Sequence, residues 1–365
     1  MDKGKYTYAG LKEKYKQYTT PDCEIRIDGT LHKEKSMMVS ALEVELTAGY
    51  EAGGCTFRIL NGYSPKKGGY TDGWLDKILV PGKLVEVKLG YIKKEVVFYG
   101  FINSVINQFD GENGATILVS CMDGKGAMMA GKHRIFGGEK KLTDIVKEIL
   151  NQYMALKVVK KVTVDNLTDL KRQVFQNCQT DYDFLVAVAR KLGYEFFIVK
   201  DEVMFVKPRK IKDPIMVFTW GENIMSFTRE IDLTEQLKEV KVIGNDEKEK
   251  KEIVGKASTI TKTGQKAASD LYDLVKKRTE TIYDPAVRTL EEANALAKSI
   301  LEDYSMQYVS GYGECVGIPE LIPGRFVKME RFDKTINGSY YIKKVTHIFD
   351  ENGYKTRFEV GANSV

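Results

Sequence analysis

Two copies of one short pattern decide the fold: LVPGKLVEV, Leu79 to Val87, and LIPGRFVKM, Leu321 to Met329. Each copy has an apolar pair, a Pro-Gly dipeptide, a basic residue and a run rich in β-forming residues. Pro-Gly favours a turn, and the alternation that follows it is typical of a strand. The pattern therefore predicts the same turn twice, at Pro81-Gly82 and at Pro323-Gly324, each leading into a strand.

The similarity continues after each turn. FINSVINQFDGENGATILVS, Phe101 to Ser120, follows the first copy, and YIKKVTHIFDENGYKTRFEV, Tyr341 to Val360, follows the second. Both contain Ile, then Val three residues later, then Phe-Asp and Glu-Asn-Gly, and the first copy has one extra residue, Gly111. Asn-Gly between β runs favours a hairpin, because both central positions of that turn prefer a positive φ. Hairpins are therefore predicted at Asn113-Gly114 and Asn352-Gly353.

The chain is thus predicted to carry one antiparallel β unit twice. Chance is the alternative, because unrelated antiparallel barrels share the same turn chemistry.

A helix followed by a hairpin is predicted in QNCQTDYDFLVAVARKLGYEFFIV, Gln176 to Val199. Thr180 can cap the helix, and Asp181 and Asp183 lie in the first turn, where the helix dipole favours negative charge. Gly193 supplies a left-handed stop. The aromatic run after it reads as the first strand of a hairpin.

Two further helices and one loop are predicted. LTDIVKEILNQYM, Leu142 to Met154, has an apolar stripe at helical spacing. TLEEANALAKSILEDY, Thr289 to Tyr304, begins with a capping box formed by Thr289 and Glu292. The charged run NDEKEKKEIVGK, Asn245 to Lys256, is predicted as an exposed loop.

These elements predict a mixed α+β, β-rich chain with two similar small antiparallel β-barrel domains and a central α+β domain. The expected divisions are an N-terminal arm at 1–20, a first barrel at 21–135, the α+β domain at 136–212, and a second barrel at 213–365 that contains a charged loop and helical insertion at about 245–305.

Composition narrows the class of protein. The 365 residues are 43% hydrophobic and 29% charged, which is ordinary for a globular protein. A formal net charge of +5 is too small to indicate a specific nucleic-acid partner. The polar N-terminus does not resemble a signal peptide, and no apolar run is long enough to predict a membrane span. Five scattered cysteines without a CxxC motif fit a reducing cytoplasm.

Catalytic and cofactor signatures are weak. GAMMAGKH, Gly126 to His133, has the spacing of a phosphate-binding loop, but His133 stands where a Mg²⁺-binding Ser or Thr is required. His32, His133 and His347 lie far apart, without the spacing of a zinc site. No catalytic, cofactor-binding or metal-binding residue is therefore predicted, and the protein is expected not to be an enzyme.

The chain resembles the phage late control D proteins, which include the tail hubs of phages and of phage-like particles of Gram-positive bacteria, and the base of the type VI secretion spike. Five motifs in the family's order carry the resemblance. They are FYGFINSV, Phe98 to Val105; QTDYDFLVAVARKLGYEFF; VKVIGND, Val240 to Asp246; EEANALAKSIL; and GYGECVGIPELIPGRFVKME with the GSYYIKKVTHIFDENGYKTRFEV that follows it.

The resemblance implies a baseplate hub. In such hubs two barrels per chain pack around an axis, braced by the middle domain, and three chains form a ring of six barrels. The trimer then joins a hexameric tail tube to a trimeric spike. The implied partners are further copies of the chain, the tail tube protein, a separate spike protein, baseplate wedge proteins and the tape-measure protein. The implied location is the baseplate centre of a virion or contractile particle assembled in the bacterial cytoplasm.

Two alternatives belong to other functional classes. A tail-tip enzyme that degrades cell-wall glycan would need two positioned carboxylates, and no pattern among 51 acidic residues selects such a pair. A carbohydrate-binding β module is compatible with the aromatic content of 10%. Aromatic residues at alternate strand positions, however, more often belong to a core or an interface.

Overall fold

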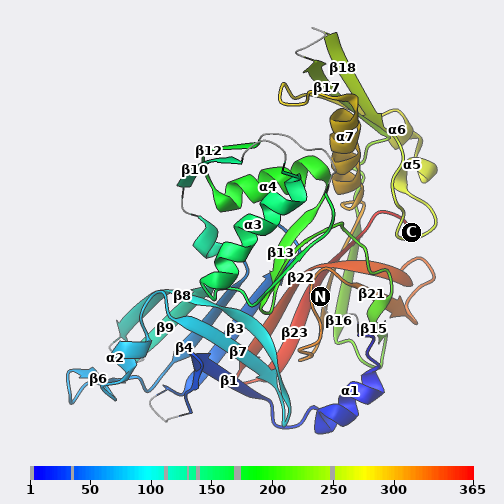
Figure 1. The fold of residues 1–365 in the computed structure, drawn as a ribbon. Helices are drawn as coiled ribbons and strands as arrows, with labels where there is room; N and C mark the ends of the chain where they lie inside the picture. Colours follow the sequence, from blue (N-terminus) through cyan, green and yellow to red (C-terminus); the bar gives the residue numbers. More distant parts are fainter. Residues whose placement is uncertain are drawn as a thin grey trace.

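The computed structural model describes residues 4–33, 37–110, 114–129, 131–136, 140–167, 174–246 and 251–365. A long β layer forms the body, and two smaller α+β lobes stand on one side of it (Figure 1). Within the described residues, no helix combines the length and the apolar character that crossing a membrane requires.

The first β unit contains seven strands of the large sheet. Its order is β3-β4-β9-β8-β7-β1-β2, and neighbouring strands are antiparallel. One face of these strands is apolar, as in β3, where Leu42, Val44 and Leu46 are buried. The strands are β1 (Asp22–Ile27), β2 (Thr30–Leu31), β3 (Val39–Thr47), β4 (Gly54–Ile59), β7 (Leu84–Gly90), β8 (Lys94–Asp110) and β9 (Gly114–Met122). The connection from β4 to β7 carries β5 (Tyr63–Ser64), β6 (Gly69–Tyr70) and α2 (Leu75–Ile78).

The second β unit repeats most of this order. Its strands run β16-β20-β23-β22-β21, and β15 pairs in parallel with β21. Their bounds are β15 (Pro214–Thr219), β16 (Ser226–Ile231), β20 (Val309–Val316), β21 (Phe326–Glu330), β22 (Gly338–Asp350) and β23 (Gly353–Ala362). The units differ at their outer strand, because β1 is antiparallel to β7 whereas β15 is parallel to β21.

The sequence predicted two similar small antiparallel β-barrel domains, and the strands of the two β units are joined in one sheet. β3 of the first unit pairs with β22 of the second, which joins all thirteen strands. The join exists because β22 continues past the end of β21, so its outer half offers unpaired backbone groups that β3 satisfies. One core cluster, which includes Val44, Ile102, Val345 and Phe358, runs through both units.

The middle segment forms an α+β lobe with its own core. Its elements are η3 (Gly126–Met128), β10 (Gly131–Phe136), α3 (Leu142–Ala155), β11 (Lys161–Val164), β12 (Val174–Thr180), α4 (Asp181–Leu192), β13 (Glu195–Val199) and β14 (Glu202–Val206). The prediction for α4 is confirmed: Thr180 Oγ1 accepts a hydrogen bond from the Asp183 N–H at 2.9 Å, and Gly193 ends the helix with φ +66°. The segment with phosphate-loop spacing continues as strand β10 rather than as a helix.

The insertion in the second unit forms another small lobe. Its elements are β17 (Glu239–Asp246), β18 (Lys251–Ala257), α5 (Ala268–Leu271), α6 (Asp273–Lys276), β19 (Thr279–Tyr283) and α7 (Leu290–Ser305). The expected charged loop at 245–256 is wrong for the described residues, because β17 and β18 form an antiparallel hairpin there. Alternate residues of this hairpin pack on α7, so one face is apolar although its composition is strongly charged.

The N-terminal segment belongs to the core, although an arm was expected at 1–20. It forms α1 (Tyr8–Lys14) and the short helix η1 (Lys16–Tyr18). Tyr15 is fully buried, and its hydroxyl donates a 2.6 Å hydrogen bond to Glu320 of the second unit. Lys14 Nζ lies 2.7 Å from Oε1 of Glu320 and 2.6 Å from Oε1 of Glu95, and Glu95 belongs to the first unit. The segment therefore ties the two units together.

Candidate assembly surface

The predicted turn of the first β unit is a specific backbone arrangement. Gly82 has φ +91°, a conformation that costs other L-residues about 1–2 kcal/mol. Its N–H donates to the Ile102 carbonyl at 2.8 Å, and the Ile102 N–H donates to the Lys83 carbonyl at 2.8 Å. Pro81 precedes this turn. The turn places the start of β7 beside the middle of β8.

The second unit repeats this arrangement bond for bond. Gly324 has φ +81°, and its N–H donates to the Ile342 carbonyl at 3.0 Å. The Ile342 N–H donates to the Arg325 carbonyl at 2.8 Å. Pro323 and Pro81 therefore precede equivalent turns, and the duplication predicted from the sequence is present in the backbone.

A matching irregularity follows each turn. The register of β8 against β9 shifts between Ile102 and Ser104. The register of β22 against β23 shifts between Ile342 and Lys344. Such a β-bulge bends its strand and increases the local twist. Both long strands therefore bend at the same point and continue outward.

The predicted hairpin turns are located at the outer ends of these strands. Asn113 lies outside the described residues, and Gly114 begins β9 with φ +76°. In the second copy Asp350 pairs with Gly353, whose φ is +106°, and Asp350 accepts a 2.7 Å hydrogen bond from the Asn352 N–H. The expectation of two positive φ angles is therefore wrong for Asn352-Gly353, where only the glycine has one. The loop centre is Glu351-Asn352, and Gly353 closes it.

The join between the two units lies in the outer half of β22. Its register runs from Lys344 opposite Thr47 to Phe349 opposite Leu42. Lys344 Nζ also forms a 2.8 Å ion pair with Glu45 on the open face. Side chains on the other face of the join enter the common core. This join was not predicted, because no local sequence pattern in β3 or β22 indicates which strand it will pair with.

A histidine is buried at this join. His347 lies opposite Val44 and is fully buried, with Nδ1 2.9 Å from Tyr354 Oη and 3.2 Å from Thr356 Oγ1. Burial, and then the charge of Lys200, lower the pKa of His347 to about 3. The ring is therefore neutral near pH 7 and acts as a structural hydrogen-bonding group.

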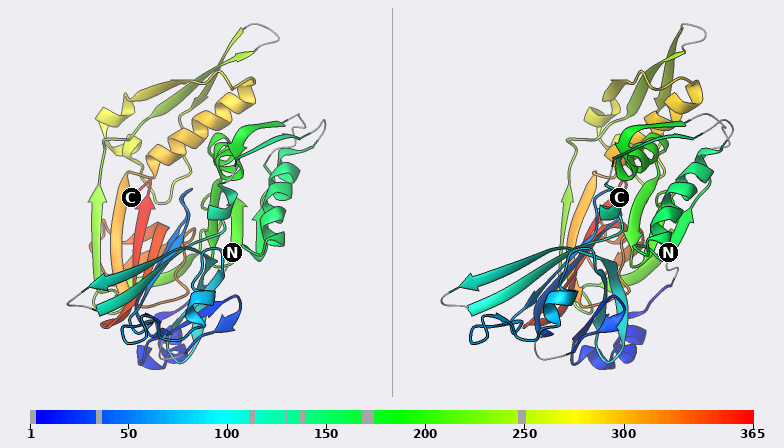
Figure 2. Two further views of the ribbon diagram at one scale, coloured as in Figure 1. Left: turned by 90° about the vertical axis from the view of Figure 1, so that its left-hand side faces the viewer. Right: turned by 60° about the vertical axis from the view of Figure 1, so that its left-hand side comes forward.

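Two of the strand edges without a strand partner among the described residues belong to the strands of the duplicated units, β16 and the outer half of β8. β16 pairs on one side with β20, and no described strand pairs with its other side. β8 pairs with β7 only as far as Phe101, so from Ser104 to Asp110 only its β9 side is paired. Figure 2 shows this end of the β8–β9 hairpin projecting from the body, and β16 at the border of the sheet beside β20. Unpaired edges of this kind favour pairing with another chain.

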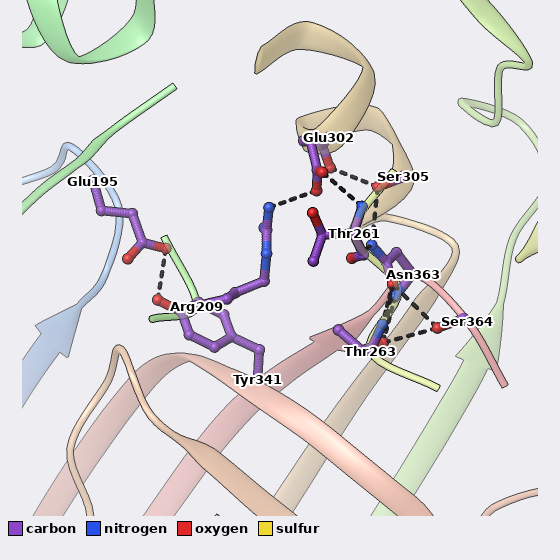
Figure 3. Close-up of polar contacts among 9 residues, drawn as sticks. All are labelled: Glu195, Arg209, Thr261, Thr263, Glu302, Ser305, Tyr341, Asn363 and Ser364. Atoms are coloured by element: carbon purple, nitrogen blue, oxygen red, sulfur yellow. Dashed lines mark hydrogen bonds and ion pairs between the residues drawn. The ribbon is translucent and has the colours of Figure 1, made fainter. Parts of the chain in front are cut away.

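A polar joint connects the small lobes to the second β unit. Arg209, which follows β14, forms a 2.7 Å ion pair with Glu302 of α7, and both side chains are about nine-tenths buried. Glu302 also accepts a 2.7 Å hydrogen bond from the Thr261 N–H. Asn363, just after β23, accepts from the Thr263 N–H at 2.8 Å and donates to the Thr261 carbonyl at 2.9 Å (Figure 3). The chain's last residues therefore hold the insertion in place.

A second contact of the joint borders a groove of about 910 Å³. Tyr341 of β22 donates a 2.6 Å hydrogen bond to Glu195 of β13 (Figure 3). Burial raises the pKa of Glu195 to about 7. The groove is lined by seven acidic and three basic side chains, with few apolar ones. Small-molecule sites are predominantly apolar, so this lining does not favour a small apolar ligand.

The comparisons with known proteins agree on the class of fold. A tail protein from Neisseria meningitidis MC58 is similar with a TM-score of 0.70 at 15% identity, covering 94% of this chain and 97% of that one. The 43 kDa tail protein of prophage MuSo2 from Shewanella oneidensis is similar with a TM-score of 0.67 at 14% identity, covering 93% and 98%. An E. coli component of the type VI secretion system gives 0.58 at 11% identity, covering 93% and 77%. The fold is therefore that of phage tail proteins and of a type VI secretion component.

The sequence comparison then gives the family. Residues 25–351 match the family described as the Alg8 N-terminal domain, and the chain belongs to that family. This description differs from that of the late control D family, which the sequence resembles. The expected similarity of fold to phage tail proteins is confirmed. No sequence among the curated proteins matches the chain.

Proposed function

We propose that this protein is a structural baseplate hub of a contractile phage tail or phage-like particle. Three copies form a ring that joins the hexameric tail tube to the trimeric central spike. The observation that carries the proposal is the duplicated β unit, with the same turn and the same bulge in both copies on one continuous sheet. Two equivalent units per chain allow three chains to present six similar surfaces around one axis.

The proposed partners follow from the two symmetries. The tail tube protein meets the pseudo-sixfold side, and a separate spike protein meets the threefold side. Baseplate wedge proteins and the tape-measure protein are the remaining candidate neighbours. The proposed location is the centre of the baseplate in a particle assembled in the bacterial cytoplasm.

The experiment that tests the hub is the solution mass by light scattering, alone and with the tail tube protein. The expected mass is three times the 41.3 kDa of the chain, in one or both conditions. Averaging of electron micrographs of the complex should then show threefold symmetry at the hub and sixfold symmetry in the tube. A chain that stays monomeric with its tube and spike proteins would overturn the proposal.

We further propose that the hub has no catalytic activity. The buried carboxylates of the joint serve structural contacts, since Glu302 pairs with Arg209 and Glu195 accepts from Tyr341. A peptidoglycan zymogram checks this proposal, with no clearing at the position of the chain as the expected result. A clearing band that survives purification to homogeneity would favour the cell-wall-degrading alternative.

A further inference from the structure

The order of strands in the sheet gives a one-to-one correspondence between the two β units. The path β3-β4-β9-β8-β7 matches the path β16-β20-β23-β22-β21. The matched turns and bulges fix the long strands against each other, because Ile102 and Ile342 make the same hydrogen bonds. β3 therefore corresponds to β16, and the outer half of β8 corresponds to the outer half of β22.

One strand pairing is present for β3 of the first unit but missing for its counterpart β16 in the second unit. Within the chain β3 pairs with the outer half of β22. The corresponding partners, β16 and the outer half of β8, are not paired with each other in the chain. They lie on different borders of the sheet (Figure 2). A second copy of the chain can supply the missing contact.

We infer that β16 of one chain pairs antiparallel with the outer half of β8 of a second copy, in the register of the β3–β22 join. This inference rests on the proposed hub and identifies the surface through which its copies meet.

The register follows from the pairings inside each unit. Val44 of β3 lies opposite Cys55, which lies opposite Cys121 of β9. In the second unit Arg229 of β16 lies opposite Gly311, which lies opposite Val360 of β23. Cys121 lies opposite Ile102, and Val360 lies opposite Ile342. Because these two isoleucines are equivalent, Arg229 corresponds to Val44.

The equivalence of His347 with Asn107 completes the register, because both lie five residues after the matched isoleucines. Since His347 lies opposite Val44 in the join, Arg229 lies opposite Asn107 of the next copy. The neighbouring pairs are Ile231 opposite Val105, Thr228 opposite Gln108, and Phe227 opposite Phe109.

The exposed apolar side chains on these edges support the pairing. Phe109 is 65% exposed, although its equivalent Phe349 packs against the main core beside Leu42. Ile231 is 45% exposed, whereas its equivalent Leu46 is 2% exposed. Phe109 and Ile231 lie on the core-side face of the inferred join, so the second copy would cover both. Burial of apolar area contributes about 25 cal/mol for each Å² removed from water.

The pairing is head to tail, so each chain uses β16 toward one neighbour and β8 toward the other. A heterologous contact of this kind closes into a ring when the rotation between copies allows it. In a three-membered ring, three joins within chains would alternate with three joins between chains. The unpaired sides of β16 and of the outer half of β8 would then be covered.

Disulfide trapping tests the register. Gln108 and Thr228 are both exposed, and the inferred pairing places them directly opposite each other across two copies. Opposed Cα atoms in antiparallel strands lie about 4.5–5.5 Å apart, within the range of about 4.4–6.8 Å that a disulfide spans. The test protein carries Gln108→Cys and Thr228→Cys with Cys178→Ser, because Cys178 is exposed. The control carries Gln108→Cys and Glu230→Cys in the same Cys178→Ser background, and its cysteine pair is two residues out of register.

Mild oxidation of the test protein, in the state in which light scattering finds a trimer, should give covalent dimers and trimers on a non-reducing gel. The out-of-register control and each single cysteine variant should give several-fold less. A trimer that forms normally but does not cross-link in the test pair would overturn the inferred pairing and leave the hub proposal standing. Equal cross-linking of the control would also overturn the register. Failure of the wild-type chain to form trimers with its tube and spike proteins would instead overturn the hub.

Discussion

Gly82 and Gly324 hold the same place in two β units: each donates its N–H to an isoleucine carbonyl, at 2.8 Å to Ile102 and at 3.0 Å to Ile342. The two turns set where β7 and β21 begin against the long strands β8 and β22. Their positive φ angles explain why glycine occupies both positions.

Gly82→Ala should lower the free energy of unfolding by about 1–2 kcal/mol, because alanine is strained at positive φ. No atom lies within 4 Å of the added Cβ, so the change in stability reports backbone strain and not a steric clash. Gly73→Ala is the matched control, since its Cβ also meets no atom and its φ lies outside the positive range. Urea unfolding measures both variants. Equal stabilities for the two would contradict the role given to the turn.

Phe109 and Phe349 should respond differently to the same substitution. Phe109→Asp should change the stability of the single chain by less than about 1 kcal/mol, because most of the ring is exposed. The same change should weaken trimer formation by at least tenfold, read from the concentration dependence of the mass. Phe349→Asp should destabilise the single chain itself, because this ring packs against the main core. A Phe109→Asp chain with unchanged trimer affinity would argue against contact through β8.

Arg209→Met should lower the free energy of unfolding by about 3 kcal/mol, because it leaves the Glu302 carboxylate buried without its cation. The double variant Arg209→Met, Glu302→Leu should recover part of this loss. Lys140→Met is the control, since Lys140 and Glu148 are both about half exposed. Its effect should stay below about 0.5 kcal/mol. Thermal unfolding of the four proteins checks the ranking, and an equal loss for Lys140→Met would contradict it.

His347 should make the protein less stable as the pH falls from about 6.5 toward 3. The pKa of the ring is about 3 in the fold and about 6.5 in the unfolded chain, so in this window the unfolded chain binds the extra proton. The contribution to stability changes by about 1.4 kcal/mol per pH unit inside the window and is constant above it. His347→Gln, which keeps a hydrogen-bonding side chain, should reduce the slope. An unchanged slope between pH 4 and 6.5 would mean that other titrating groups, and not His347, cause the pH dependence of stability.

Glu195 should act in the opposite direction over an overlapping window, so that between about pH 4.5 and 6.5 the two contributions oppose each other. Its pKa is about 7 in the fold and 4.5 as the reference value, so the folded chain holds the extra proton between these values. This contribution favours the fold at low pH and is lost as the pH rises through 7. Glu195→Gln, which keeps an acceptor for Tyr341, should remove this contribution, so the stability of the variant relative to the wild type should rise between pH 5 and 7. Unfolding curves at matched ionic strength compare the two proteins.

Local signals allowed much of the fold to be predicted. The cap at Thr180 and the stop at Gly193 act through neighbouring backbone groups, so a short stretch of sequence specifies them. The repeated Pro-Gly turns were found for the same reason. Leu290 shows the limit of local signals: although it is apolar and is the first residue of α7, its side chain is 56% exposed.

Long-range contacts could not be predicted from one sequence. Nothing near Glu45 indicates Lys344 as its partner, and nothing near Arg209 indicates Glu302. The charged residues of β17 and β18 masked an alternation in which Val240 and Val242 are buried. Such pairings depend on which edges remain open once all strands have formed.

The β3–β22 join also has a kinetic consequence. Because both strands belong to one polypeptide, they meet at an effective concentration set by the connecting chain and not by the amount of protein present. Only contacts between separate chains depend on expression level. A duplicated chain can therefore complete a closed ring with fewer bimolecular encounters than six separate units would need, at concentrations where single units would remain apart.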